Sequence, residues 1–298
     1  MDFKDLSYVI AIAKTQNITK AADMLYVTQP TLTKFLQNLE REMGQKLFKK
    51  LGNRFVLTYA GERYVAKATE ILNLKKELDQ EMGDIIRQNA GLLKIAFPTM
   101  RGTYTLPIFR SLYPHVRLEI REAHSSLLEG MLLNGDADLA FFNLPVKNPD
   151  IDYQIISHEE VVLVLGNDHP LKNKGIKKEG CKYPWLDLKL LENEPFILQP
   201  PDQRTRQTVD QLFKSCHIHP QICLQTGNIP AAAELASQGY GACFVTETHL
   251  KHIPFKKKPV LFSVGTPNTT VDFVAAFRKG SYLSYHAQEY IKIVRDFT

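Results

Sequence analysis

The fold of the N-terminal part of this chain is decided by the stretch Ala21-Ala22-Asp23-Met24-Leu25-Tyr26-Val27-Thr28-Gln29-Pro30-Thr31-Leu32-Thr33. The paired alanines are small enough for another helix to approach a short helix over residues 20–25, and Tyr26-Val27 forms a turn. Thr28 can cap the next helix, Pro30 suits its first turn, and Gly44 follows its end. The stretch therefore predicts two helices joined by a tight turn.

The predicted helix after the turn has one apolar and one polar face. Leucines at 32, 36 and 39 form its inner stripe. The outward positions carry mostly short polar or basic groups that suit phosphates and base edges, namely Gln29, Thr31, Thr33, Lys34, Gln37, Asn38 and Arg41. Polar residues at the N-terminal end of the second helix are typical of a recognition helix in the major groove. An ordinary helical hairpin with a solvated face is the alternative.

Both flanks of this hairpin extend the pattern. Upstream, Phe3, Leu6, Ile10 and Ala13 recur at spacings of three and four, which predicts a first helix. Downstream, residues 46–58 read as two β-rich runs around a Gly-Asn turn, with Lys49, Lys50 and Arg54 near its tip. The flanks predict a three-helix module with a basic wing.

The charge of the chain is concentrated in this module. Residues 1–67 hold 11 Lys/Arg and 6 Asp/Glu, so they carry the whole net charge of +5 in a chain of 298 residues. A basic module on a neutral body indicates a polyanionic partner, most simply nucleic acid, although chance clustering is an alternative. With 44% hydrophobic and 23% charged residues, the composition is that of a globular protein with two or three domains.

At residue level the module resembles a known family. Ala21-Ala22-x-x-Leu25-x-Val27-Thr28-Gln29-Pro30-Thr31-Leu32-Thr33, Leu39-Glu40-x-Glu42-x-Gly44-x-x-Leu47-Phe48 and Leu57-Thr58-x-Ala60-Gly61 closely resemble the winged helix-turn-helix of LysR-type transcriptional regulators. Thr28 and Thr33 stand where Ser is commoner in that family, and Lys50 where Arg is commoner. The resemblance, with the polar face above, implies DNA contacts by Thr28, Gln29, Pro30, Thr31, Thr33, Lys34, Asn38, Lys50 and Arg54.

A long helix is predicted after the wing. From residue 60 to about 88 there is no proline, and apolar positions follow an alternating four-three spacing that is typical of a coiled-coil seam. An amphipathic helix packed on its own domain would show a similar stripe. The resemblance, in which this linker pairs two subunits, favours dimerisation through Tyr64, Ala68, Ile71, Leu78, Met82 and Ile85.

Beyond residue 90 strands alternate with helices, which predicts an α/β body with mainly parallel sheets. Residues 128–141 and 234–245 resemble two stretches of the LysR-type effector domain, which implies two α/β subdomains similar to periplasmic solute-binding proteins. The predicted architecture is a winged helix-turn-helix (residues 1–58), a linker helix (59–89) and an effector-binding domain (90–298). Subdomain I takes about 90–163 and 267–298, and subdomain II about 164–266.

In such sheets ligands gather where strands end and helices begin, and the unpaired N–H groups there favour anions. These loops match the effector-binding loops of the family, although any one of their residues could instead be only a turn or cap. Arg101 and Arg204 would supply counter-charge to a small anionic effector such as a carboxylate. The predicted effector contacts are Thr99, Met100, Arg101, Ser125, Gln199, Arg204, Thr205, Asn228 and Thr246.

Several other functions are disfavoured. The sequence has no GxSxG, Walker, HExxH or GxGxxG motif, so we expect no enzyme, and no zinc spacing, so we expect no metal or cofactor. A peroxide-sensing disulfide between Cys216 and Cys223, as in some relatives, is an alternative input, and a solute-binding protein is an alternative for the body alone. No apolar run could span a membrane, and the charged N-terminus indicates a cytoplasmic protein. The expected partners are promoter DNA, the effector and a second copy in a homodimer or homotetramer, with RNA polymerase as a possible further partner.

Overall fold

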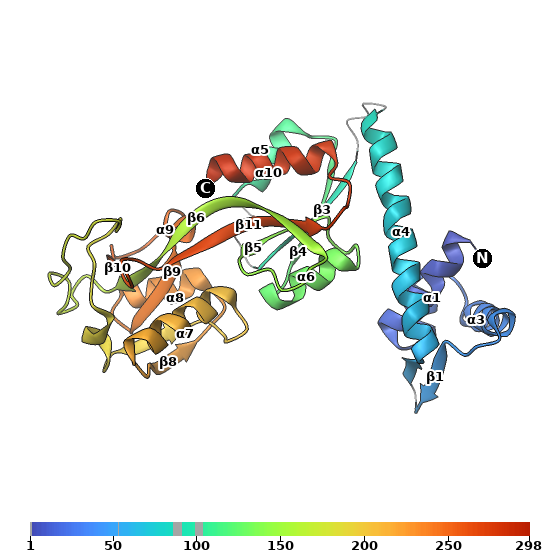
Figure 1. Ribbon diagram of the computed structural model, residues 1–298, viewed down its shortest axis with the longest axis horizontal. Helices are drawn as coiled ribbons and strands as arrows, with labels where there is room; N and C mark the ends of the chain where they lie inside the picture. Colours follow the sequence, from blue (N-terminus) through green and yellow to red (C-terminus); the bar gives the residue numbers. More distant parts are fainter. Residues whose placement is uncertain (1, 53, 86–90, 99–103) are drawn as a thin grey trace. The chain divides into compact units, whose positions relative to one another are not determined.

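The computed structural model describes residues 2–52, 54–85, 91–98 and 104–298. The chain divides into two compact units, Met1–Arg87 and Gln88–Thr298, each described here by itself. The first unit contains α1 (Phe3–Thr15), α2 (Ile18–Met24), α3 (Gln29–Met43), β1 (Phe48–Leu51), β2 (Arg54–Leu57) and α4 (Tyr59–Ile85), as Figure 1 shows.

The first unit is a winged helix-turn-helix with its own core. Side chains of α1, α2 and α3 pack together with Leu47 and Phe48 of the wing, and Val9, Ile12 and Leu32 are fully buried. β1 and β2 pair antiparallel to form the wing. The helices, the turn and the wing predicted from the sequence are all present.

One buried carboxylate fastens the wing to the recognition helix. Glu40 on α3 accepts hydrogen bonds from the backbone N–H of Leu47 (2.9 Å) and Phe48 (3.2 Å) and from Lys46 Nζ (2.7 Å). On the other side of the wing, a Cβ on Gly61 would lie 2.0 Å from the carbonyl oxygen of Leu47, so only glycine fits there. These contacts explain why glutamate stands at position 40 and glycine at position 61 of the family motif quoted above.

The second unit is the α/β body. Its elements are β3 (Leu92–Phe97), α5 (Leu106–Leu112), β4 (Arg117–Glu122), α6 (Ser125–Leu133), β5 (Leu139–Asn143), β6 (Ile151–Leu165), the 3-10 helix η1 (Leu188–Leu191), β7 (Pro195–Leu198), α7 (Arg204–Cys216), β8 (Gln221–Gln225), α8 (Ile229–Ser237), β9 (Ala242–Thr246), α9 (Glu247–Leu250), β10 (Val260–Ser263), β11 (Thr270–Arg278) and α10 (Tyr285–Phe297). The strands follow the order β4-β3-β5-β11-β6-β9-β7-β8, and β10 also pairs with β6.

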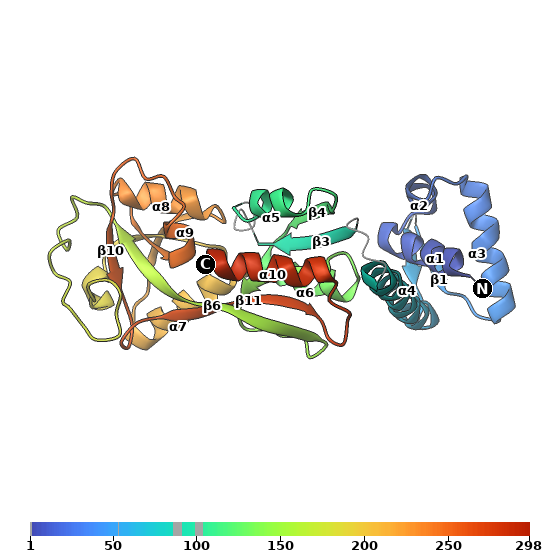
Figure 2. The same cartoon turned by 90° about the horizontal axis from the view of Figure 1, so that it is seen from above.

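The body has two subdomains that share one strand. Residues 151–160 of β6 pair with β11 in subdomain I, whereas residues 161–165 pair with β9 and β10 in subdomain II. Figures 1 and 2 show β6 running through both halves of the body. The expectation of mainly parallel sheets is therefore wrong in part. β3 pairs parallel with β4 and β5, and β7 with β8 and β9, but β6, β10 and β11 pair antiparallel.

Each subdomain sheet is covered on both faces, because successive strand residues point to opposite sides. In subdomain I, Phe141 belongs to the core under α5 and α10, and its neighbour Phe142 belongs to the core under α6. In subdomain II, Phe244 packs with α7, and its neighbour Val245 packs with α8. The N-termini of α6, α7 and α8 follow the ends of strands, which is where the effector loops were expected.

Candidate DNA-binding and effector-binding sites

The N-terminal turn of α3 carries an ordered polar surface. Thr28 caps the helix, and its hydroxyl lies 2.7 Å from that of Thr31. Gln29 Nε2 donates to Thr33 Oγ1 (2.8 Å), which itself donates to the Gln29 carbonyl (2.9 Å). Thr28, Gln29, Pro30, Thr31 and Lys34 are exposed. These side chains are therefore free to meet another molecule while being held in defined positions.

The remaining predicted DNA contacts lie farther along α3 and on the wing. Asn38 is partly exposed and accepts a hydrogen bond from Arg41 (3.0 Å). Lys50 and Arg54 are exposed on β1 and β2, where Lys50 pairs across the wing with Phe55. The wing therefore presents both cations predicted as DNA contacts, and Lys49 beside them is exposed as well.

The stripe on α4 divides into a covered and an exposed part. Ala68 is only 1% exposed, in the part of the helix that contacts α1, and Tyr64 is half-buried against the core of its own domain. Both side chains thus contribute to packing within the chain, and their place in a dimer seam stays a prediction. Farther along, the exposed apolar side chains are Ile71, Leu74, Leu78 and Met82. Leu74 was not among the predicted seam residues, and the side chain of Ile85 lies outside the described residues.

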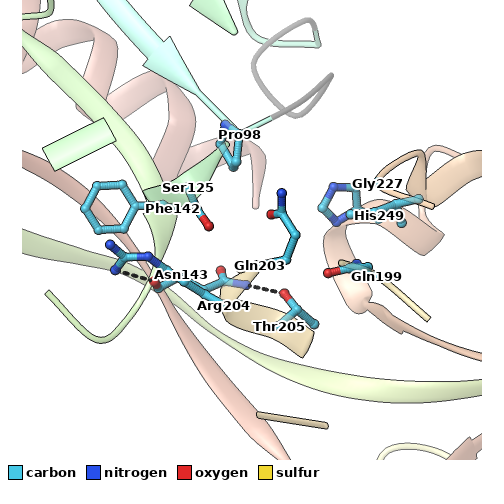
Figure 3. Close-up of a pocket in the computed structure, with 11 residues that line it drawn as sticks. Pro98, Ser125, Phe142, Asn143, Gln199, Gln203, Arg204, Thr205, Gly227 and His249 are labelled. Carbon is cyan, nitrogen blue, oxygen red and sulfur yellow. Dashed lines mark hydrogen bonds between the residues drawn. The ribbon is translucent and has the colours of Figure 1, made fainter. Parts of the chain in front are cut away.

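A polar pocket lies between the two subdomains (Figure 3). Its empty volume, which includes open solvent at its mouth, is about 430 Å³. Ser125 and Asn143 line it from subdomain I, and Gln199, Gln203 and Thr205 line it from subdomain II. Its further lining residues are Pro98, Phe142, Arg204, Gly227, Ile229 and His249. Four predicted effector contacts are thus brought together: Ser125, Gln199, Arg204 and Thr205.

Ser125 has the chemistry of a ligand contact. It is the first residue of α6, is 3% exposed, and its hydroxyl has no hydrogen-bond partner within the described part of the chain. Figure 3 shows this hydroxyl directed into the pocket. A buried hydroxyl without a partner is costly, so a bound molecule that bonds to it would gain affinity.

Arg204 differs from its predicted role. The sequence predicts it as a counter-charge for the effector, but its guanidinium crosses to subdomain I and forms an ion pair with Glu129 (2.5 Å). It also donates to the carbonyls of Asn143 (3.1 Å) and Pro145 and lies over the ring of Phe142. Arg204 is 5% exposed and Glu129 is 8% exposed. The charge of Arg204 is therefore already balanced inside the protein.

The carboxyl of Glu129 is kept ionised by its surroundings. Burial alone would raise its pKa, but hydrogen bonds from Arg204 and from the backbone N–H of Lys147 and Asn148 lower the pKa below its usual value. Burial lowers the pKa of Arg204, and Glu129 opposes that effect. At neutral pH the pair is fully charged.

Two other predicted effector contacts have partners within the chain. The Asn228 side chain caps α8 by accepting from Ala231 N–H (3.1 Å), and Thr246 Oγ1 lies 2.9 Å from His249 Nδ1. Neither of them lines the pocket as the structure has it. The predicted contacts Thr99, Met100 and Arg101 lie outside the described residues.

The sequence reasoning missed three polar lining residues, Asn143, Gln203 and His249. Asn143 Nδ2 donates to Thr205 Oγ1 (3.1 Å), and Gln203 Nε2 lies 2.8 Å from His124 Nδ1, so both join the subdomains. A signal for Asn143 was present, since it directly follows the apolar run Leu139-Ala140-Phe141-Phe142, which has the pattern of a buried strand, and ligands gather at the ends of such strands.

Among the described residues, no three His, Cys, Asp or Glu side chains are grouped so that they could hold a metal ion. None of the described helices combines the length and the apolar character of a membrane span. Cys216 and Cys223 are both free thiols. Cys216 packs against the core of subdomain II, whereas the Cys223 thiol is 3.4 Å from the carbonyl of Phe196 on β7.

A winged helix-turn-helix combined with a two-subdomain body and a polar cleft defines a class, the ligand-responsive DNA-binding regulators. The family model "LysR substrate binding domain" matches residues 87–298, and "Bacterial regulatory helix-turn-helix protein, lysR family" matches residues 3–62. The chain belongs to the LysR family. It is a LysR-type DNA-binding transcriptional regulator with an effector-binding domain, and not an enzyme.

Individual relatives are similar to this chain over nearly its full length. The uncharacterized HTH-type transcriptional regulator YcgK of Bacillus subtilis is 28% identical over 99% of this chain and 94% of its own length. A full-length OxyR variant from Pseudomonas aeruginosa has a similar fold, with a TM-score of 0.74 at 21% identity over 100% of this chain and 94% of that one. CbnR in complex with its target DNA has a TM-score of 0.61 at 23% identity, with full coverage of both chains.

Proposed function

We propose that this regulator binds promoter DNA as a dimer or tetramer and alters transcription when a small anion occupies the pocket between its subdomains. The proposal rests on the presence of two features in one chain: an exposed, hydrogen-bonded polar face on α3, and a pocket lined by the unpartnered hydroxyl of Ser125. RNA polymerase is a proposed further partner, because a regulator bound at a promoter lies beside the transcription machinery. The cytoplasm is the proposed location.

DNA contact is assigned to the recognition helix and the wing. Thr28, Gln29, Pro30, Thr31, Thr33, Lys34 and Asn38 would face the major groove, where amides and hydroxyls read base edges. Lys50 and Arg54 on the wing would bind DNA phosphates, and these contacts would fix the position of the recognition helix along the duplex. The intrahelical bond between Gln29 and Thr33 supports this assignment because it holds the Gln29 amide in place before DNA arrives.

We expect Gln29→Ala and Lys50→Ala to affect DNA binding differently. In a titration of duplex DNA from the promoter region beside the gene, the logarithm of the wild-type affinity should fall with the logarithm of salt concentration, with a slope of about −0.9 per neutralised phosphate. Gln29→Ala should keep this slope but reduce discrimination against scrambled duplex by about 1 to 3 kcal/mol. Lys50→Ala should weaken both duplexes alike and flatten the slope. A wild-type affinity that does not change with salt contradicts the DNA-binding proposal.

A small anion is the effector class that the geometry of the pocket supports best. α6, α7 and α8 each begin at a pocket-lining residue, so their N-terminal N–H groups and dipoles converge on one space. Ser125 and Thr205 add hydroxyls, and Gln199 and Gln203 add amides. Since Arg204 is neutralised by Glu129, backbone groups rather than this guanidinium would meet the negative charge of the ligand.

We expect Ser125→Val to abolish the response to effector while leaving DNA affinity unchanged. The substitution removes the unpartnered hydroxyl and fills part of the pocket, far from the DNA-binding unit in sequence. The measurement is effector-dependent transcription from a reporter promoter, with DNA affinity determined in parallel. Ser126→Val is the matched control, because Ser126 is exposed on the same turn and does not line this pocket. Loss of response in both variants, or in neither, argues against the site.

The redox alternative has a separate test. A variant in which both Cys216 and Cys223 are replaced by serine should respond to effector as the wild type does. If this variant does not respond, the regulator senses thiol oxidation and not a small-molecule effector.

A further inference from the structure

The turn between α2 and α3 is closed by a complete helix C-cap motif. The N–H of Val27 donates to the carbonyl of Ala22 (3.0 Å), and the N–H of Tyr26 donates to the carbonyl of Asp23 (3.2 Å). These two bonds define the Schellman arrangement, in which the residue after the C-cap is left-handed. Tyr26 occupies that position with a φ of +55°. The backbone of the helix-turn-helix therefore requires a left-handed residue at 26.

Tyrosine is a poor choice for that backbone conformation. Glycine adopts it without a steric penalty, whereas the Cβ of any larger residue crowds the neighbouring backbone. Among the other left-handed positions described in this unit, Gly44 and Gly52 follow the usual preference, whereas Gln16 does not. A strained residue persists when the surrounding structure holds it in place, and such residues are frequent at functional sites.

Within the described chain nothing favours the side chain of Tyr26. It is 96% exposed, more than any other large hydrophobic or aromatic residue that the structure describes as exposed. No hydrogen bond, ring contact or cation contact involves its side chain among the described residues. The two Schellman bonds hold the strained backbone, and the Tyr26 side chain is left available to a partner outside the folded chain.

The position of Tyr26 indicates the partner. It lies two residues before Thr28, the cap of the recognition helix, and three before Gln29. In a helix-turn-helix the end of the first helix and the start of the recognition helix flank the wall of the major groove, where the phosphates lie. A phenol can donate one hydrogen bond to a phosphate oxygen, and tyrosine is among the side chains that contact DNA backbones.

We propose that the hydroxyl of Tyr26 donates a hydrogen bond to a DNA backbone phosphate beside the recognition helix, and that the turn keeps a strained tyrosine for this contact. The inference rests on the proposed DNA-binding function and adds a contact residue to it. The contact is neutral, so it differs in its salt dependence from those of Lys50 and Arg54. It is independent of base sequence, so it also differs from that of Gln29.

The test compares Tyr26→Gly with Tyr26→Phe. Tyr26→Gly relieves the backbone, so its thermal midpoint should rise by about 2 °C or more, while its affinity for the promoter duplex should fall about tenfold. Tyr26→Phe keeps the strain, so its midpoint should match the wild type while its affinity falls by a similar factor. Both variants should lose affinity equally on promoter and scrambled duplex, with the wild-type slope against salt, because a phenol displaces no counterion. Tyr240→Phe, an exposed tyrosine of the effector domain, is the control and should bind as the wild type does.

Three outcomes overturn the inference. If Tyr26→Gly binds the promoter duplex with wild-type affinity, Tyr26 makes no contact with the DNA. If the thermal midpoint of Tyr26→Gly is lower than that of the wild type, the backbone at Tyr26 is not strained. Full affinity in Tyr26→Phe together with a loss in Tyr26→Gly assigns the contact to the ring and not to the hydroxyl. Failure of the wild-type chain to bind any duplex is distinguishable from these, because it refutes the proposed function and the inference falls with it.

Discussion

Replacing Arg204 by alanine is expected to lower the free energy of unfolding of the effector domain by about 3 to 5 kcal/mol. The substitution leaves the Glu129 carboxylate, which is 8% exposed, without its charged partner, and it empties the space over the ring of Phe142. The only tryptophan of the chain, Trp185, lies in this unit, so its fluorescence during urea unfolding reports on the effector domain. A change below about 1 kcal/mol would show that the pair is solvated and contributes little.

The matched control replaces both partners. Arg204→Met combined with Glu129→Leu removes the ion pair without leaving a buried charge, so it should recover much of the stability lost in Arg204→Ala. The acid side gives a second check. Because the pKa of Glu129 is lowered in the folded chain, its contribution is present above the usual glutamate pKa and is lost as the pH falls through the lowered value. Glu129→Gln should therefore show a weaker loss of stability in acid.

Replacing Leu78 by aspartate is expected to convert the proposed dimer or tetramer to monomers and to weaken promoter binding by about 100-fold to 10,000-fold. Leu78 is 56% exposed in one chain, in the middle of the exposed part of the α4 stripe. In a helix pair it would be buried, so the substitution would place an unpaired charge in the interface. A monomer engages one half-site, and the gain from linking two DNA-binding modules disappears.

The measurement is molar mass by light scattering, followed by DNA titration. Ala66→Asp is the control, since Ala66 is exposed on the same helix away from the stripe, and this variant should keep the wild-type mass. If Leu78→Asp also keeps the wild-type molar mass of an oligomer, the subunits associate through another surface. Ala68→Asp is not an equivalent test, because Ala68 is buried in its own domain and the substitution would unfold it.

The winged helix-turn-helix could be predicted nearly residue by residue because its signals are local. Caps, a turn and an apolar stripe lie within a few residues of one another, and Glu40 and Gly61 act on a wing close to them in sequence. The strand and helix order of the body was also readable from alternating patterns. What the patterns did not reveal was β6, whose 15 residues serve both subdomains, because its residues 152–155 are largely exposed whereas its residues 159–165 are buried on both faces and show no alternation.

The loops that form the effector site could be predicted from the sequence, but the role of each residue in them could not. Arg204 at the start of a helix after a strand has the local pattern of a ligand counter-charge, and nothing near it in sequence suggests Glu129, 75 residues away. The same holds for Asn143, whose partner Thr205 lies 62 residues farther along. For Tyr64 and Ala68, helical spacing alone could not distinguish a seam between subunits from packing on α1. Such pairings are decided by tertiary contacts.

The three consecutive residues Gln203, Arg204 and Thr205 each bond to subdomain I, and this arrangement bears on how many conformations the effector domain can adopt. Since the N-cap and first turn of α7 carry all three, we expect an opening of the body to release them together. Each subunit would then switch between two states, closed and open, without stable intermediates. To turn over such a two-state population from 1:99 to 99:1, a ligand must prefer one state by about 10⁴-fold. Weakening this turn of α7 would lower that requirement and make the same promoter sensitive to weaker ligands.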